Sequence, residues 1–333
     1  MTPITRRQFL TTSAIVAAGA GMGCHTDSPG ADLIIDMHQH VNYGGKRDKD
    51  LHQISPGRSE AQLLQHQHNM GVSRTILLPS GHPCIRPSTH EGFSNGLEST
   101  CAPNEGCYET ARAHPDEFYF GANEVPDLEG APQVVEKFLK MGAVVIAEVK
   151  FGLECDSPQM QEYYRLAADY KVPILMHWQY GKYNYGYDRF PKMLEKYSKT
   201  TFIGHAQTFW AHIDKNYKDD DKNLYPKGKV TPGGWTDRYL SDYPNFIGDL
   251  SAGSGNNALT RDPEQARAFI ERHQDQLVFG SDCSDRIGHG EACSGWMTIQ
   301  AIRQLSPSKA IERKLLYQNT KRIFRLGPHG ERS

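Results

Sequence analysis

Two histidines, His38 and His40, stand two positions apart at the end of the apolar run 33–35. Side chains of a β-strand alternate between its two faces, so both imidazoles would point the same way. Two imidazoles on one face at a strand end are half of a metal site. A His-x-His pair taken alone fits two half-exposed loop histidines equally well, so the rest of the chain must decide.

Other apolar runs also end in residues that bind metals or transfer protons. These residues are Glu148 and Lys150 in the run 143–150, His177 after 172–176, His205 after 201–204, Asp249 in 245–250 and Asp282 after 276–281. So many residues of these types at the ends of apolar runs are not expected by chance. They predict a metal site in which the cation lowers the pKa of water to about 7 and a carboxylate moves the proton. Asp282 is placed for both ligation and proton transfer.

Eight apolar runs alternate with helical patterns along the chain: 33–40, 73–78, 118–122, 143–150, 172–176, 201–204, 245–250 and 276–281. This alternation is typical of an α/β fold with parallel strands, and eight units predict a closed (β/α)8 TIM barrel. The alternative, an open doubly wound sheet, would carry a Gly-rich phosphate loop after its first strand, where this chain has 36–40 instead. The active site of such a barrel lies at the carboxyl ends of its strands.

The N-terminus predicts export. Arg6 and Arg7 precede the small and apolar run 11–22, the order of parts of a Tat signal. We expect a signal peptide and linker over 1–31, the barrel over 32–327, a tail over 328–333, and a periplasmic or cell-envelope location. Cys24 leaves a lipid anchor open, although Gly21 stands where lipoboxes usually carry an aliphatic residue. We expect no integral membrane domain, because no second long apolar span follows.

The 333 residues carry 37 Lys+Arg and 39 Asp+Glu, a net charge of −2, which gives no support for a nucleic-acid partner. The sequence leaves open whether the protein forms a homo-oligomer. The seven cysteines include no Cys-x-x-Cys pair, so a thiolate zinc knuckle is not expected. Cys84 and Cys101 lie near the two ends of the Gly-, Pro- and Ser-rich loop 79–103 and could join them in a disulfide, with free thiols as the alternative.

Five short motifs carry a family resemblance: IDMHQH at 35–40, ILMH at 174–177, FIGHA at 202–206, LVFGSD at 277–282 and YQNTKRIF at 317–324. In this order and spacing they resemble the amidohydrolase superfamily, and within it the amidohydrolase-2 group of metal-dependent hydrolases and decarboxylases. The resemblance implies metal ligation by His38, His40, His177 and Asp282, and a set of nitrogen and oxygen ligands favours Zn²⁺. It places His205 beside a single metal, polarising the substrate or positioning water, or on a second metal where there are two.

The fourth strand leaves the number of metals open. In one interpretation, Glu148 bridges two metals, as a Glu or a carboxylated Lys does in two-metal members of that family. In the other, Glu148 and Lys150 form an ion pair that holds or orients the substrate. We favour the pair and one metal, because a buried charge needs a partner. Asp249 would orient a ligand histidine. Further substrate-binding candidates are Trp178, which follows His177, Arg286, which follows Asp282, and His82 on the long loop.

The sequence therefore predicts a metal-dependent hydrolase that cleaves a C–N or C–O acyl bond of a small molecule, such as an amide, ester or lactone. Asp282 and His205 would be its catalytic residues. A first alternative is a non-oxidative decarboxylase of an aromatic or unsaturated acid, which would need a cationic carboxylate clamp at Arg286 or Lys150. A second is an exported metal-binding protein without catalysis.

Overall fold

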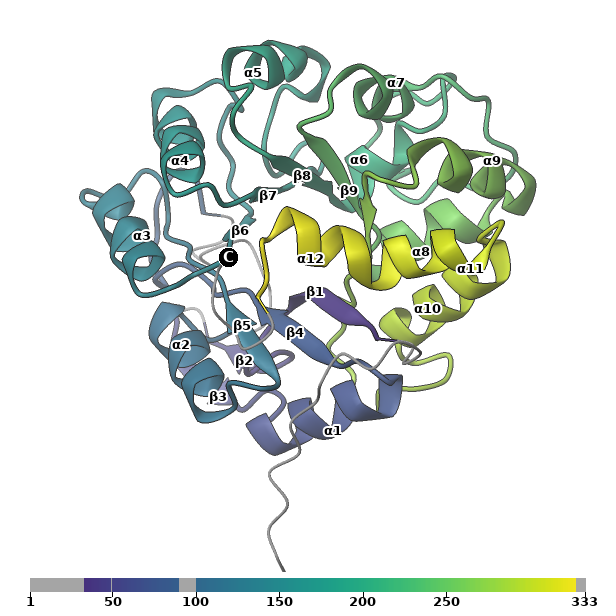
Figure 1. Ribbon diagram of the computed structural model, residues 1–333. Coiled ribbons are helices and arrows are strands. Elements are labelled where there is room, and N and C mark those ends of the chain that lie inside the picture. The colour runs from purple at the N-terminus through teal and green to yellow at the C-terminus, as the bar shows by residue number, and fades with distance from the viewer. Residues whose placement is uncertain (1–32, 49, 90–99, 328–333) are drawn as a thin grey trace, which may run out of the picture. The chain divides into compact units, whose positions relative to one another are not determined.

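Eight parallel strands form the centre of the fold in the computed structural model (Figure 1), which describes residues 33–48, 50–89 and 100–327. They are β1 (Ile35–Gln39), β4 (Arg74–Leu77), β5 (Phe118–Phe120), β6 (Ile146–Val149), β7 (Ile174–His177), β8 (Phe202–His205), β9 (Phe246–Asp249) and β10 (Leu277–Val278). Each coincides with one of the expected apolar runs. The predicted export signal, Cys24 and the tail 328–333 lie outside the described residues.

The strands pair in chain order and close on themselves. One sheet runs β1-β4-β5 and another runs β10-β9-β8-β7-β6. A parallel bridge between Ala122 and Ile146 joins β5 to β6. Met37 N donates to Phe279 O at 3.1 Å and Asp282 N donates to His38 O at 2.8 Å, so the segment after β10 pairs with β1. The prediction of a closed α/β barrel is confirmed, and its closure brings Asp282 beside His38.

Helices surround the barrel (Figure 1). They are α1 (Glu60–Met70), α2 (Asn104–Ala113), α3 (Ala131–Lys140), α4 (Pro158–Asp169), α5 (Pro191–Lys196), α6 (Ala206–Ala211), α7 (Trp235–Asp242), α8 (Ala252–Thr260), α9 (Pro263–His273), α10 (Ser294–Leu305), α11 (Lys309–Arg313) and α12 (Asn319–Ile323), with the short turns η2 (Tyr187–Arg189) and η3 (Lys314–Gln318) and the antiparallel pair β2 (Lys46–Arg47) and β3 (Gln53–Ser55). Ser59 begins α1 with a capping box and Gly71 ends it with a φ of 77°, a conformation that glycine adopts without strain.

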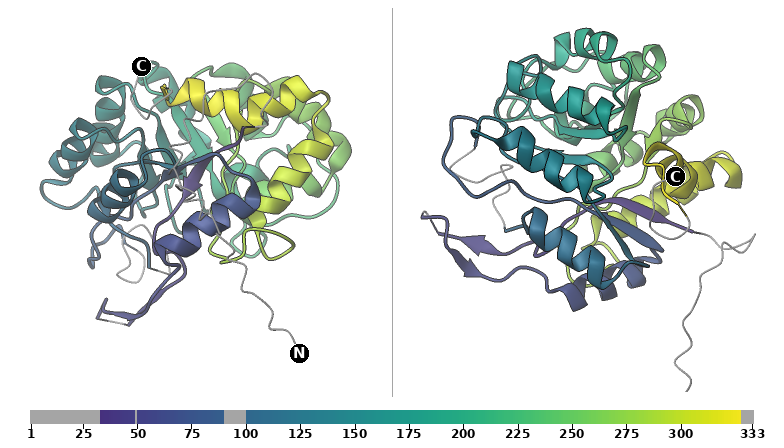
Figure 2. Two further views of the ribbon diagram at one scale, coloured as in Figure 1. Left: turned by 60° about the horizontal axis from the view of Figure 1, so that its bottom comes forward. Right: turned by 60° about the vertical axis from the view of Figure 1, so that its left-hand side comes forward.

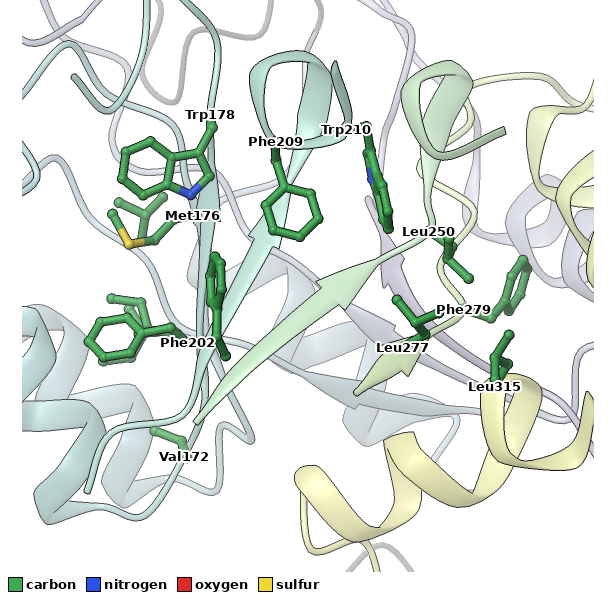
Figure 3. Packing of buried hydrophobic residues seen from close by; sticks show 14 of the residues in the cluster. Val172, Met176, Trp178, Phe202, Phe209, Trp210, Leu250, Leu277, Phe279 and Leu315 are labelled. Carbon is green, nitrogen blue, oxygen red and sulfur yellow. The ribbon is translucent and has the colours of Figure 1, made fainter. Parts of the chain in front are cut away.

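Strand residues alternate between two apolar layers. On β7, Leu175 belongs to the cluster inside the barrel, whereas Met176 belongs to the larger cluster between strands and helices. Figure 3 shows part of that outer layer, with Trp178 near Met176. Because His177 lies two residues after Leu175, it faces the barrel interior at the mouth, and Trp178 faces the helices. The same alternation turns His205 inward on β8.

The thiols of Cys84 and Cys101 are both free, so no disulfide staples the long loop between them. Within residues 33–48, 50–89 and 100–327, no helix has the length and apolar character needed to cross a membrane.

Candidate metal centre

Five side chains converge at the mouth of the barrel. His38 and His40 come from β1 and its end, Glu148 from β6, His205 from β8, and Asp282 from the segment after β10. Their facing atoms lie 3.5–3.8 Å apart: His38 Nε2 is 3.7 Å from Glu148 Oε2 and 3.8 Å from Asp282 Oδ1, His40 Nε2 is 3.6 Å and 3.5 Å from the same two atoms, and His205 Nε2 is 3.7 Å from Glu148 Oε1 and 3.6 Å from Asp282 Oδ2.

Three of these atoms are buried without a hydrogen-bond partner: His38 Nε2, His40 Nε2 and Glu148 Oε2. Buried polar atoms nearly always have a partner, and the Nε2 to Oε2 distances of 3.6 Å and 3.7 Å are too long for a good hydrogen bond. Ligand atoms about 2.1 Å from a tetrahedral cation stand about 3.4 Å from one another. The spacing and the nitrogen and oxygen donors therefore fit a shared divalent cation.

A second layer of polar groups fixes the imidazole rings. His38 Nδ1 lies 2.8 Å from Asp249 Oδ2, and His40 Nδ1 donates to Leu78 O at 2.8 Å. Ser251 Oγ lies 3.0 Å from His205 Nδ1 and donates to Asp249 Oδ2 at 2.7 Å. A hydrogen bond at Nδ1 leaves Nε2 free to bind a metal, and it also sets the ring's orientation. Asp249 thus occupies the place of a carboxylate that orients ligand histidines.

The electrostatics of the centre favour positive charge. Burial alone would lower the pKa of His38, but Asp282, Asp249 and Glu148 raise this pKa to about 10. Burial would raise the pKa of Asp282, yet His38, His205 and His40 hold that pKa well below its usual range. A field that retains an extra proton on a buried imidazole also attracts a divalent cation in its place.

His177 stands on the far side of Glu148. Its Nδ1 lies 2.5 Å from Glu148 Oε1, and its ligand atom groups with those of Glu148 and His205. Burial and the nearby Lys150 lower the pKa of His177 to about 3, so the neutral ring donates from Nδ1 to Glu148. Lys150 Nζ lies 5.4 Å from the centre of the Tyr183 ring. Glu148 therefore accepts a short hydrogen bond from the neutral His177 ring, and the charge of Lys150 lowers the pKa of both groups.

Tyr43 belongs to the centre although the sequence reasoning missed it. Its hydroxyl donates to Asp282 Oδ1 at 3.1 Å, and its ring lies 4.9 Å from that of His40. Cys101 also lies near His40: burial would lower the pKa of His40, and Cys101, Asp282 and Glu148 raise it. The position of Tyr43, three residues after His40 in the turn that leaves the strand, is the signal that could have identified it.

Three expected substrate-binding residues lie apart from this cluster. Trp178 is buried in the outer layer, with ring-centre distances of 4.9 Å to Tyr187 and 4.8 Å to Phe190. Arg286 is exposed. The His82 ring is 69% exposed, with Nδ1 3.3 Å from Glu124 Oε2. Arg286 and His82 lie in loops, where the sequence does not determine the direction of a side chain. Trp178 comes directly after the inward-facing His177, so the alternation along β7 turns it toward the helices.

No protein-family model and no curated protein matches the sequence. Solved structures match the fold. An uncharacterised TIM-barrel protein of Bordetella bronchiseptica is 13% identical with a TM-score of 0.59, over 90% of this chain and 100% of that chain. A probable 2-pyrone-4,6-dicarboxylic acid hydrolase of Acinetobacter baumannii is 14% identical with a TM-score of 0.52, over 87% and 98%. A 2,6-dihydroxybenzoate decarboxylase is 13% identical with a TM-score of 0.53, over 88% and 99%. The chain therefore has the TIM-barrel fold that these proteins share, the fold that its sequence predicted.

Proposed function

We propose that this protein is a metal-dependent hydrolase that cleaves a C–N or C–O acyl bond of a small molecule, such as an amide, ester or lactone. The observation that carries the proposal is the convergence of three unpartnered buried atoms, on His38, His40 and Glu148, beside the carboxylate of Asp282. His38, His40, Glu148 and Asp282 would hold one divalent cation, with His205 beside it.

A divalent cation at this place would supply Lewis-acid chemistry, polarising an acyl oxygen and lowering the pKa of water. The chain's own groups do the rest. The Asp282 side chain is 10% exposed while those of His38, His40 and Glu148 are 0–1% exposed, so Asp282 is the member that solvent and substrate reach. Its carboxylate can take a proton and return it to the leaving group. The Tyr43 hydroxyl, already on Asp282, can orient it or donate to a substrate oxygen.

Zn²⁺ suits the imidazole and carboxylate donors, and Mn²⁺ suits the carboxylates. Glu148 leaves room for a two-metal alternative, since Oε2 faces His38 and His40 and Oε1 faces His177 and His205. We favour one cation because the Nδ1 atom of His177 is already bonded to Glu148. Elemental analysis of the wild type and of Glu148→Gln tests this: loss of two equivalents in the variant would support a bridging role, whereas loss of at most one would support a single cation at the barrel mouth.

Decarboxylation on the same scaffold is the second candidate. The charge of Lys150 lowers the pKa of Glu148 and of His177, so this lysine is the candidate to hold a substrate carboxylate. The structural likeness to a 2,6-dihydroxybenzoate decarboxylase points the same way. Release of carbon dioxide from aromatic acids, compared with hydrolysis of lactones, esters and amides, separates the two reactions.

The decisive variant is Asp282→Asn, which keeps the shape of the side chain and removes its proton-accepting charge. We expect turnover to be lost while the circular dichroism spectrum and the thermal midpoint stay close to wild type. Asp156→Asn is the matched control, because Asp156 pairs with Arg189 away from the centre and should leave turnover unchanged. Full activity of metal-loaded Asp282→Asn would contradict the mechanism.

We further propose that the protein works outside the cytoplasm. The support is the arginine pair before an apolar run within residues 1–31, with the lipid anchor at Cys24 as an open variant. Fractionation of cells that express the wild type and an Arg6→Lys, Arg7→Lys variant tests this. Retention of the wild type in the cytoplasm would contradict it.

A further inference from the structure

A second group of metal-binding side chains lies behind the first. His66 comes from α1, Cys283 and Asp285 from the segment after β10, and Cys293 is the N-cap of α10. Their ligand atoms all lie within 4.8 Å of one another. His66, Cys283 and Cys293 are buried, and the Asp285 side chain is 12% exposed. A closed four-residue set of this kind is typical of a structural site, since a catalytic one keeps a position open.

The distances between these atoms fit a tetrahedral zinc ion. Zinc binds sulfur at about 2.3 Å and imidazole nitrogen at about 2.0 Å, so two sulfur ligands stand about 3.8 Å apart and sulfur and nitrogen about 3.5 Å. Here the two Sγ atoms are 3.6 Å apart, and His66 Nε2 lies 3.3 Å from Cys283 Sγ and 3.7 Å from Cys293 Sγ. Asp285 Oδ2 is closer, 2.9 Å from His66 Nε2, a direct contact that a cation would replace.

The surroundings also suit such a complex. Cys293 Sγ accepts a hydrogen bond from Trp296 N at 3.3 Å, at the positive end of the α10 dipole, where negative charge is favoured. The guanidinium of Arg58 is fully buried and donates to Cys283 O at 3.2 Å and to Asp285 O at 2.8 Å, while its Nε and Nη2 have no hydrogen-bond partner. Two thiolates, one carboxylate and Zn²⁺ sum to a charge of about −1, which the positive charge of Arg58 balances.

We propose that Cys283, Cys293, His66 and Asp285 bind a structural zinc ion, separate from the metal at the barrel mouth. Thiolate ligands select zinc over magnesium, calcium or manganese, and a mixed S, N and O tetrahedral set is characteristic of zinc. A disulfide is the competing state of the two cysteines, but its S–S bond is about 2.05 Å long and the two sulfurs lie 3.6 Å apart.

The zinc ion would fasten the segment that carries Asp282. Cys283 is the next residue, and its carbonyl accepts from Gln39 Nε2 at 3.2 Å and from Arg58 Nη1. The ligand His66 and its neighbour Asn69, which donates to Ile287 O at 2.6 Å, attach this segment to α1. The left view of Figure 2 shows α1 beside the loop that leads into α10. The structural ion would thus position a carboxylate of the centre without touching substrate.

The test measures metal and sulfur ligation together. Full-length protein is purified in reducing buffer with zinc supplied, and the wild type, Cys293→Ser and Cys155→Ser are compared by elemental analysis. Cys155 is a buried thiol whose Sγ donates to Gly186 O at 3.2 Å, so its replacement is the matched control. We expect Cys293→Ser to hold one equivalent of zinc less than the wild type, and Cys155→Ser to hold as much as the wild type.

X-ray absorption at the zinc edge needs no variant at these sites and keeps the proposal testable if Cys293→Ser does not fold. We expect sulfur scattering at about 2.3 Å in the wild type, and also in Cys101→Ser, which excludes the Cys101 thiol beside His40 as its source. His40→Ala should retain this signal even if the barrel-mouth metal is lost. Equal zinc in wild type and Cys293→Ser, zinc without sulfur neighbours, or a Cys283–Cys293 disulfide in the purified protein would each overturn the proposal.

Discussion

Asp249 offers the sharpest test of how the barrel-mouth centre is held. Its Oδ2 lies 2.8 Å from His38 Nδ1, 3.1 Å from His205 Nδ1 and accepts from Ser251 Oγ, while Oδ1 accepts from Ser251 N at 3.0 Å. In Asp249→Asn, the amide has two possible orientations. If its oxygen accepts from Ser251 N, its NH₂ group faces the two imidazole N–H donors. The opposite rotamer would set the NH₂ group against Ser251 N–H. Either way one donor faces another.

Loss of one such partner typically weakens metal binding by 10- to 100-fold. Asp249 orients the ligand His38 and also holds His205 beside the cation, so we expect the upper end, about 100-fold, or about 2.7 kcal/mol at 1.36 kcal/mol per tenfold. Competition with a chromophoric chelator measures the apparent Kd of the apoprotein. Circular dichroism and thermal unfolding then show whether the fold itself has changed.

Asp237→Asn is the matched control. Asp237 on α7 is also a buried aspartate bonded to a histidine, with Oδ1 2.7 Å from His273 Nε2, but it lies away from the barrel mouth. It should lower stability while leaving the metal Kd unchanged. If Asp249→Asn binds metal as tightly as the wild type, the imidazoles need no oriented partner, and the assignment of the centre fails.

Three further outcomes follow from the geometry. Tyr43→Phe should lower kcat at least about tenfold with metal content unchanged, because a hydrogen bond to the charged Asp282 contributes about 1.5–3 kcal/mol; unchanged kcat would contradict this. Metal binding at about pH 8 should release protons, because the apoprotein holds the pKa of His38 at about 10, and the metal affinity should fall as the pH is lowered. Calorimetry in buffers of different ionisation enthalpy measures the proton release. Binding without proton release would refute a protonated His38 in the apoprotein. Trp178→Ala should cost about 3–5 kcal/mol of unfolding free energy in urea, whereas Arg286→Ala should leave both stability and turnover near wild type.

Much of the fold could be predicted because buried strands need continuous apolar sequence. All eight runs became barrel strands, and the parallel arrangement followed from their alternation with helices. Two helices have no clear signal in the sequence, for local reasons. Residues 252–260 of α8 are rich in Gly, Ser and Asn, which have low helix propensity. The six residues of α6 begin directly after His205 without a side-chain cap.

The sequence could predict those site residues that lie at the carboxyl ends of the strands. Glu148, His205 and Asp282 meet His38 and His40 because the carboxyl ends of parallel strands share one rim. Side-chain direction beyond the strand ends depends on loop geometry, which a pattern does not contain.

The second metal cluster shows the same limit of sequence patterns. A search for Cys-x-x-Cys spacing could not find it, because Cys283 and Cys293 stand ten residues apart and His66 lies 217 residues before Cys283. Only closure of the barrel, which sets α1 beside the segment after β10, brings these residues together.

The backbone of Asp282 connects the two metal-binding clusters. This residue has a φ of 39°, a left-handed conformation that costs a non-glycine residue about 1–3 kcal/mol and persists only where the surroundings enforce it. On one side, Asp282 N donates to His38 O at 2.8 Å. On the other side, the Cys283 carbonyl accepts from Gln39 and Arg58. A carboxylate on a segment held at both ends keeps its place when a proton or a cation changes its charge, which is what a group that moves protons beside a metal requires.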